Sequence, residues 1–190
     1  MNENKIKLWT IQHNIVINKL KKEGVYYVKK RFIKEKYRES AHIFLKAYNY
    51  FVSKMKNKVN KPEKAEYPIW LTSDPERLEL HPDHKIIELE IYKDKVVIFD
   101  EKKWNYILNL SYIPVDEKDA QKHKKKLKKY NLNDDSEAYL SDHYPLLKRE
   151  IENSWDCLFD KSIRLSENNK AASWQLRLEW VKNINDIKES

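Results

Sequence analysis

Glycine is nearly absent from this chain, since Gly24 is the single glycine among 190 residues. Loops that cradle phosphate groups need glycines, because a Cβ keeps backbone N–H groups away from a ligand. Walker-type loops, dinucleotide-binding turns and the nucleophile elbow all depend on such loops. The composition therefore argues against P-loop NTPases, dinucleotide-binding dehydrogenases, kinases and α/β-hydrolases.

Cysteine and long apolar runs are also scarce. Cys157 is the single cysteine, which excludes an internal disulfide framework and a cysteine-based zinc site. No stretch approaches the roughly 18 apolar residues of a membrane-spanning helix, and the chain opens with polar residues rather than a signal-peptide pattern. These features predict a soluble, cytoplasmic protein without a membrane partner.

Charged and aromatic residues are abundant instead. The formal net charge is +8 and the sequence pI is about 9.2. Such a balance is typical of proteins that bind nucleic acid or other polyanions, although it also arises when lysines are merely solvated. Six Trp, twelve Tyr and five Phe provide apolar surface for a folded core. A chain of this length fits a single domain, 1–190.

The spacing of apolar residues predicts an α+β fold with a twisted, mainly antiparallel sheet. Strands are expected over the ranges 5–11, 86–92, 95–99 and 173–181, and the second and third are expected to form a hairpin. Asn14 is expected to cap a short helix that ends at Gly24. A long helix is expected over 31–57, with further short helices elsewhere.

A polar, lysine-rich insertion is expected at 111–142 within the single domain. It contains the densest basic run of the chain: Lys122, Lys124, Lys125, Lys126, Lys128 and Lys129. Proteins that bind single strands usually interleave aromatic rings with basic groups, whereas here Tyr130 stands only at the margin. The run is therefore either a nucleic-acid contact or a solvated basic helix.

The predicted last strand has one apolar and one polar face. The apolar face carries Trp174 and Trp180, which would hold the strand rigidly, as a binding site requires. An edge strand with a solvated outer face would show the same pattern. His81 and His84 match no zinc signature, so we expect no metal site there.

The order of several motifs resembles a bacterial domain-of-unknown-function family, number 3841, over nearly the whole chain. The motifs are Lys7–Gln12, Gly24–Tyr26, Phe44–Tyr50, Tyr67–Trp70, Ile87–Asn109, Ser154–Trp155, Phe159–Asp160 and Trp174–Leu176. The chain departs from the family pattern at Asn105, where a His is usual, and at Gln175, where a Glu is usual. If those positions carry chemistry in the family, this chain has lost it.

The chain also resembles, more distantly, ADP-ribosyltransferase-like domains, which implies NAD as a cofactor. In that comparison Thr10 and Gln12 would contact the nicotinamide ribose, and Tyr67 or Trp70 would supply a stacking wall. The last strand should then lie beside or close to the first, so that Gln12 and Gln175 share one cleft.

The same resemblance implies two catalytic positions. Gln175 would replace the Glu that stabilises an oxocarbenium-like transition state, and a neutral amide would weaken transfer severely. Glu179 would substitute for it only in a different register.

Three classes of function remain open. The first is an uncharacterised intracellular bacterial or phage protein with a nucleotide- or NAD-binding cleft, a degenerate ADP-ribosyltransferase-like domain. The second is a non-catalytic module that binds a nucleotide or nucleic acid. The third is a domain that binds a protein partner, such as a phage or mobile-element regulator. The sequence does not decide whether the protein is an enzyme.

Overall fold

The structure is a computed structural model that describes residues 4–79 and 81–185. The chain divides into two compact units: unit 1 comprises Met1–Ile98 and Lys170–Ser190, and unit 2 comprises Phe99–Asn169. The expected α+β class with an antiparallel sheet is confirmed. The expected domain 1–190 with its insertion at 111–142 stays a prediction.

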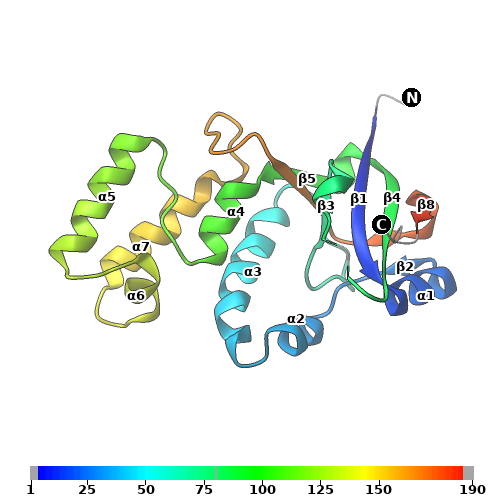
Figure 1. Cartoon of the computed structure of the whole chain (residues 1–190), viewed down its shortest axis with the longest axis horizontal. Coiled ribbons are helices and arrows are strands. Elements are labelled where there is room, and N and C mark those ends of the chain that lie inside the picture. Colours follow the sequence, from blue (N-terminus) through cyan, green and yellow to red (C-terminus); the bar gives the residue numbers. More distant parts are fainter. Residues whose placement is uncertain (1–3, 80, 186–190) are drawn as a thin grey trace. The chain divides into compact units, whose positions relative to one another are not determined.

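Unit 1 is built on a six-stranded antiparallel sheet in the order β5-β6-β3-β1-β4-β8 (Figure 1). The strands are β1 (Lys5–His13), β3 (Ile69–Thr72), β4 (His84–Tyr92), β5 (Val96–Asp100), β6 (Asn169–Ser173) and β8 (Val181–Asn185). A separate pair joins β2 (Val25–Tyr26) to β7 (Leu176–Arg177). The chain enters unit 2 through β5 and returns through β6.

The strands β1 and β4 form the longest ladder, which runs from Lys5↔Tyr92 to His13↔His84. Side chains alternate between the two faces of a strand, so Leu8 and Leu89 share one face and Trp9 lies on the other. On the first face, the core includes Ile17 and Leu20 of α1 (Asn14–Glu23). This helix therefore buries its apolar side against the centre of the sheet.

The sequence predicted the C-terminal end of α1 correctly and its N-terminal cap incorrectly. Gly24 ends the helix in the left-handed region at φ 75°, and its N–H donates to the Leu20 carbonyl, as expected. The expected Asn14 cap is wrong, because His13 Nδ1 accepts the hydrogen bond of the Ile15 N–H at 3.0 Å. Asn14 is already the first helical residue, and its own N–H donates to the Asp83 carbonyl.

The expected single helix over 31–57 is wrong. The chain forms α2 (Lys30–Tyr37), a 3-10 turn (Arg38–Ser40) and α3 (Ala41–Met55), and the backbone of Arg38 is non-helical at φ 46°, ψ −118°. In a continuous helix Tyr37 and Phe44 would lie two turns apart, about 10 Å along the axis. The break instead stacks their rings at a centroid distance of 3.8 Å.

The expected hairpin between the second and third predicted strands is also wrong. Both edges of β4 are occupied, one by β1 and the other by β8, so β5 pairs with β6 instead. The 3-10 turn Lys93–Lys95 leads the chain away from β4. Ser173 Oγ donates to the Lys95 carbonyl at 3.0 Å, which links the end of β6 to this turn.

The expected last strand over 173–181 is interrupted. The chain leaves the large sheet after β6, pairs with β2 through β7, makes a 3-10 turn (Leu178–Trp180) and returns as β8. Trp174 and Trp180 are buried as expected, whereas Leu178 is 39% exposed. Trp174 Nε1 donates to the Val59 carbonyl at 2.9 Å, so this tryptophan is fixed by a polar contact as well as by packing.

Unit 2 is helical. It contains α4 (Glu101–Leu108), α5 (Glu117–Lys129), α6 (Asp135–Leu140), α7 (Pro145–Ser154) and a 3-10 helix (Trp155–Phe159). Its buried residues include Trp104, Ile107, Ile151 and Trp155. In the ranges 4–79 and 81–185, no helix combines the length and apolar character needed to cross a bilayer.

Candidate functional site

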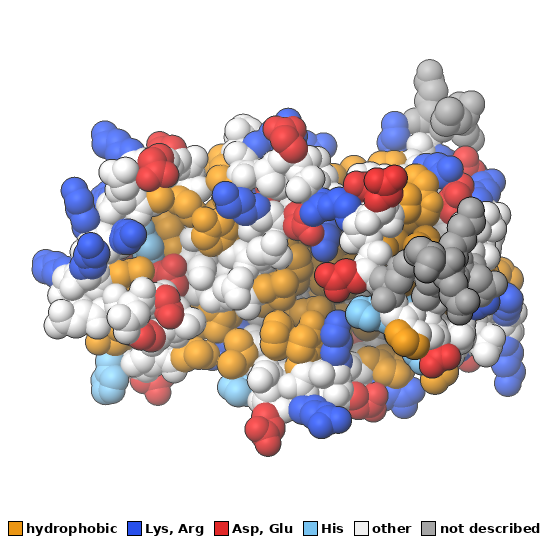
Figure 2. Space-filling view, in the orientation of Figure 1, with side chains coloured by type: hydrophobic (Ala, Val, Ile, Leu, Met, Phe, Trp, Pro, Cys, Tyr) orange, Lys and Arg blue, Asp and Glu red, His pale blue; other side chains and the backbone are white. Residues whose placement is uncertain are grey.

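Helix α5 has one charged face and one anchored face. We call the exposed lysines of the predicted basic run the lysine face: Lys122, Lys124, Lys125, Lys128 and Lys129. His123 and Leu127 are buried on the opposite side. Figure 2 shows basic side chains gathered over the place that α5 occupies in Figure 1. The helical period thus places the lysine face toward solvent and His123 and Leu127 toward the interior of unit 2.

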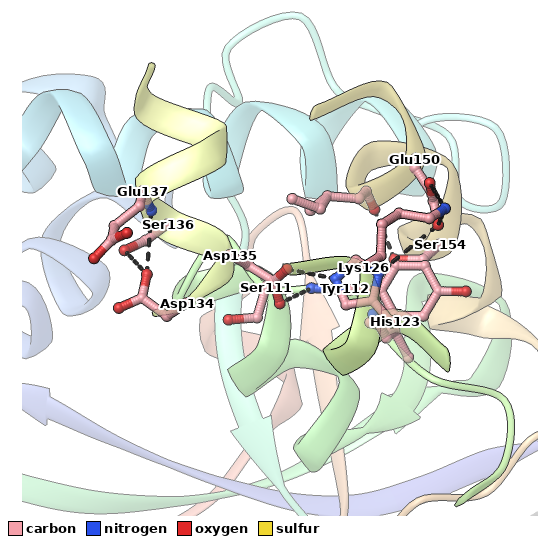
Figure 3. A network of polar contacts seen from close by, with 12 residues as sticks. Ser111, Tyr112, His123, Lys126, Asp134, Asp135, Ser136, Glu137, Glu150 and Ser154 are labelled. Carbon is pink, nitrogen blue, oxygen red and sulfur yellow. Dashed lines mark hydrogen bonds and ion pairs between the residues drawn. The ribbon is translucent and has the colours of Figure 1, made fainter. Parts of the chain in front are cut away.

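A polar network fixes the inward side of α5 (Figure 3). His123 Nε2–H donates to an Asp135 carboxylate oxygen at the start of α6. The other Asp135 oxygen accepts the Tyr112 backbone N–H at 3.0 Å, and the Tyr112 ring stacks on the His123 ring at 4.0 Å. The His123 imidazole is therefore held at its edge by the hydrogen bond to Asp135 and on one face by the Tyr112 ring.

A second contact joins α5 to α7. Lys126 Nζ donates to Glu150 Oε1 at 2.7 Å, and His123 Nδ1 lies 3.7 Å from the same oxygen. The Tyr112 hydroxyl donates to Asp119 at 3.0 Å. Burial, together with this carboxylate, raises the pKa of Tyr112 above its usual range. The tyrosine therefore stays protonated and donating at neutral pH.

The six lysines of the predicted run consequently differ in what they contact. Lys126 is held by Glu150, as described above. None of the five side chains of the lysine face forms an ion pair or a hydrogen bond with a residue in the described ranges 4–79 and 81–185. Their ammonium groups are therefore available to an external anion.

The candidate residues of unit 1 are only partly brought together. Gln12 Nε2 donates to Thr10 Oγ1 at 2.8 Å, and Thr10 Oγ1 donates to the Trp70 carbonyl at 2.9 Å. Thr10 is 2% exposed, so its hydroxyl serves mainly to join β1 to β3. Gln12 is half-buried at the end of β1.

The two candidate stacking residues are occupied by packing. Trp9 pairs with Thr72, so these two side chains and that of Trp70, two residues before Thr72, share one face of the sheet. Gln12, three residues after Trp9 on β1, lies on the opposite face. The Trp70 ring makes edge contacts with Tyr48 at 5.5 Å and Phe51 at 4.9 Å. Tyr67 is buried and its hydroxyl donates to Asn49.

The candidate catalytic residues lie outside the large sheet. Gln175 stands between β6 and β7, where its Oε1 accepts the Tyr27 hydroxyl at 3.2 Å. Glu179 is exposed in a 3-10 turn and forms a 2.8 Å ion pair with Arg177. Since β3 separates β6 from β1, Gln175 and Gln12 do not come from neighbouring strands.

A polar pocket that the sequence did not reveal lies next to Gln12. Gln12 pairs across the ladder with Lys85, which lines a pocket of about 380 Å³. Side chains of α1, β4 and β8 surround it: Asn14, Ile17, Asn18, Lys21, Lys85 and Ile184. The helical steps of three and four explain the α1 residues, but their approach to β4 and β8 depends on the tertiary fold.

The comparison with protein families decides the relationship of the chain. The model described as "Domain of unknown function (DUF3841)" matches residues 7–182. This chain belongs to the DUF3841 family. The resemblance inferred from the motif order is therefore confirmed. No curated protein and no solved structure matches the chain, and nothing in the comparisons supports a relationship to ADP-ribosyltransferases or a bacterial or phage origin.

The two departures from the expected family pattern occupy different surroundings in this DUF3841 protein. Asn105 is exposed on α4, and Gln175 is half-buried against Tyr27. Among the residues that the structure describes, no three His, Cys, Asp or Glu side chains are arranged to hold a metal ion. His81 and His84 lie 5.7 Å apart in an edge contact between their rings.

Proposed function

We propose that this DUF3841 protein binds nucleic acid through the lysine face of α5. The observation that carries the proposal is the set of five exposed ammonium groups on one side of a single helix, without partners in the described residues. Phosphate groups are the natural counterpart, because binding them releases condensed counterions.

The anchoring of α5 supports this function over simple solvation. Its inward side is held by Asp135 of α6 and Glu150 of α7, so the lysine face is presented from a fixed helix. Positively charged groups on a rigid element lose less freedom when they contact an anion than groups on a mobile tail. The formal net charge of +8 adds long-range attraction.

The experiment measures salt dependence. Replacing all five residues of the lysine face with Gln should flatten the log–log dependence of the association constant on salt by about 4 units, because each phosphate contact contributes about 0.7 to 0.9. Fluorescence anisotropy with a labelled oligonucleotide between low and physiological salt gives this slope.

A matched control removes the same charge elsewhere. Five exposed lysines of unit 1 can be replaced with Gln together: Lys22, Lys30, Lys34, Lys56 and Lys64. This control variant should keep nearly the parental slope. Equal slopes for the parent and the lysine-face variant would show that the run is a solvated helix.

A second candidate function is nucleotide binding in unit 1, with NAD as one such ligand. The polar pocket favours it, because Lys21 and Lys85 converge there beside Gln12 within a volume that suits a small ligand. Calorimetry with NAD and ATP tests it: Lys21→Glu should abolish binding, whereas the neighbouring Lys22→Glu should not. If the protein shows transferase chemistry, Gln175→Glu should raise NAD hydrolysis above the parental rate. No heat of binding in the parent protein would exclude this candidate.

A further inference from the structure

A pair of tyrosine rings lies where α5 ends. Tyr130 immediately follows the helix, is its C-cap residue and is 46% exposed. Tyr144 follows α6 in the chain and is the residue directly before α7. The fold brings their ring centroids to 5.8 Å at an interplanar angle of 66°, which is an edge contact.

The position of this pair relative to the lysine face suggests a shared ligand. Tyr130 is preceded by Lys128 and Lys129, the last two members of that face. From Lys122 to Lys129 the helix rises about 10 Å, which corresponds to a few nucleotides of backbone. An exposed ring at the end of such a basic row can stack on a base.

Stacking distinguishes single strands from duplexes. A duplex keeps the faces of its bases inside the stack, so it offers the lysine face only phosphates. An unpaired base can lie flat on an aromatic ring, and this contact tolerates any sequence because every base has a π-face. The edge contact from Tyr144 limits how Tyr130 can rotate, so we assign stacking to Tyr130 and positioning to Tyr144.

We propose that the lysine face and Tyr130 form one site for single-stranded nucleic acid. The proposal rests on the proposed function of α5 and adds the class of substrate. Charge alone would favour a duplex, because its charge density is higher than that of a single strand. Preference for a single strand therefore reports on the ring and not on the lysines.

The experiment compares a labelled oligothymidylate of about 15 nucleotides with a duplex of equal length. The parent protein should bind the single strand at least about fivefold more tightly than the duplex. Tyr130→Leu should lower the affinity for the single strand by about fivefold or more and leave the affinity for the duplex unchanged. Tyr130→Phe, which keeps the ring, should bind both as the parent does.

Tyr92→Leu is the matched control, because Tyr92 is a similarly exposed tyrosine on unit 1 and should not affect binding. Equal or tighter binding of the duplex by the parent protein would overturn the inference, and this comparison needs no variant. The inference is also overturned if the lysine-face variant binds neither ligand while Tyr130→Leu, shown to be folded by its thermal melt, still binds both as the parent does. In that case the proposed function of α5 would stand. If the parent binds neither ligand, the proposed function itself fails.

Discussion

At the scale of single residues, Asp100 joins two separate segments of unit 2. Its Oδ1 accepts the Lys102 N–H at 2.8 Å, which caps α4. Its Oδ2 accepts the N–H groups of Leu165 and Ser166 at 2.7 and 2.8 Å. Burial opposes ionisation, but these hydrogen bonds outweigh it and hold the pKa of Asp100 below its usual value. The ionised carboxylate is therefore the form that stabilises this region.

Asp100→Asn should lower the free energy of unfolding at pH 7 by about 2 kcal/mol, since a charged cap is replaced by a weaker acceptor. The folded-state pKa is depressed, so the contribution of Asp100 is complete above the unfolded value of about 3.9. It is lost as the pH falls through the lower folded value. Urea unfolding at pH 7 and near pH 3 checks this, and the difference between parent and variant should shrink at the acid end.

Asp142→Asn, at an exposed position of the same unit, serves as the control and should behave as the parent at both pH values. A difference between parent and Asp100→Asn that persists unchanged in acid would show that the charge on Asp100 is not the stabilising feature.

At the scale of elements, local periodicity predicted the two long central strands, and tertiary contacts decided how the strands pair and where helices break. The β1 and β4 strands follow from strict alternation, as at Ile87, Leu89 and Ile91, because one face of each is buried. The partner of β5 could not be predicted, since it depends on β8 occupying the far edge of β4. The break at Arg38 lies within an amphipathic pattern that continues on both sides of it.

The candidate sites divide in the same way. The basic run of six lysines was visible in the sequence, because a dense cluster of lysines is a local signal. The separation of Lys126 from the other lysines was not, because it depends on Glu150 of another helix. The partnership of Tyr130 and Tyr144 and the pocket beside Gln12 likewise depend on residues far apart in the chain.

The contacts of α3 set the effect of truncating its two phenylalanines. Phe51 is fully buried and packs on Trp70, whereas Phe44 is half-buried and stacks on Tyr37. Phe51→Ala should therefore cost about 3–5 kcal/mol of unfolding free energy, and Phe44→Ala clearly less. Chemical denaturation of both variants gives the comparison, and an equal or larger loss for Phe44→Ala would contradict the assignment of Phe51 to the core.

At the scale of the whole molecule, a polyanion can be attracted either by the net charge of the chain or by the lysine face alone. The chain has thirty-eight Lys and Arg residues and thirty Asp and Glu residues. Some lysines outside α5 form ion pairs, as Lys5 and Lys182 do with Glu90. The opposed charges cancel at short range, so the uncompensated lysine face should dominate the attraction of a polyanion.

Lysine footprinting tests this distribution across the entire chain. Limited acylation with an amine-reactive ester, read by peptide mass spectrometry, should show the lysine face several-fold less reactive when single-stranded oligonucleotide is present. The control lysines Lys22, Lys30 and Lys34 should react equally with and without it. Lys126 should react slowly in both states, because Glu150 already holds its ammonium group. Protection spread evenly over the chain would mean that the net charge, and not the face that α5 presents, attracts the ligand.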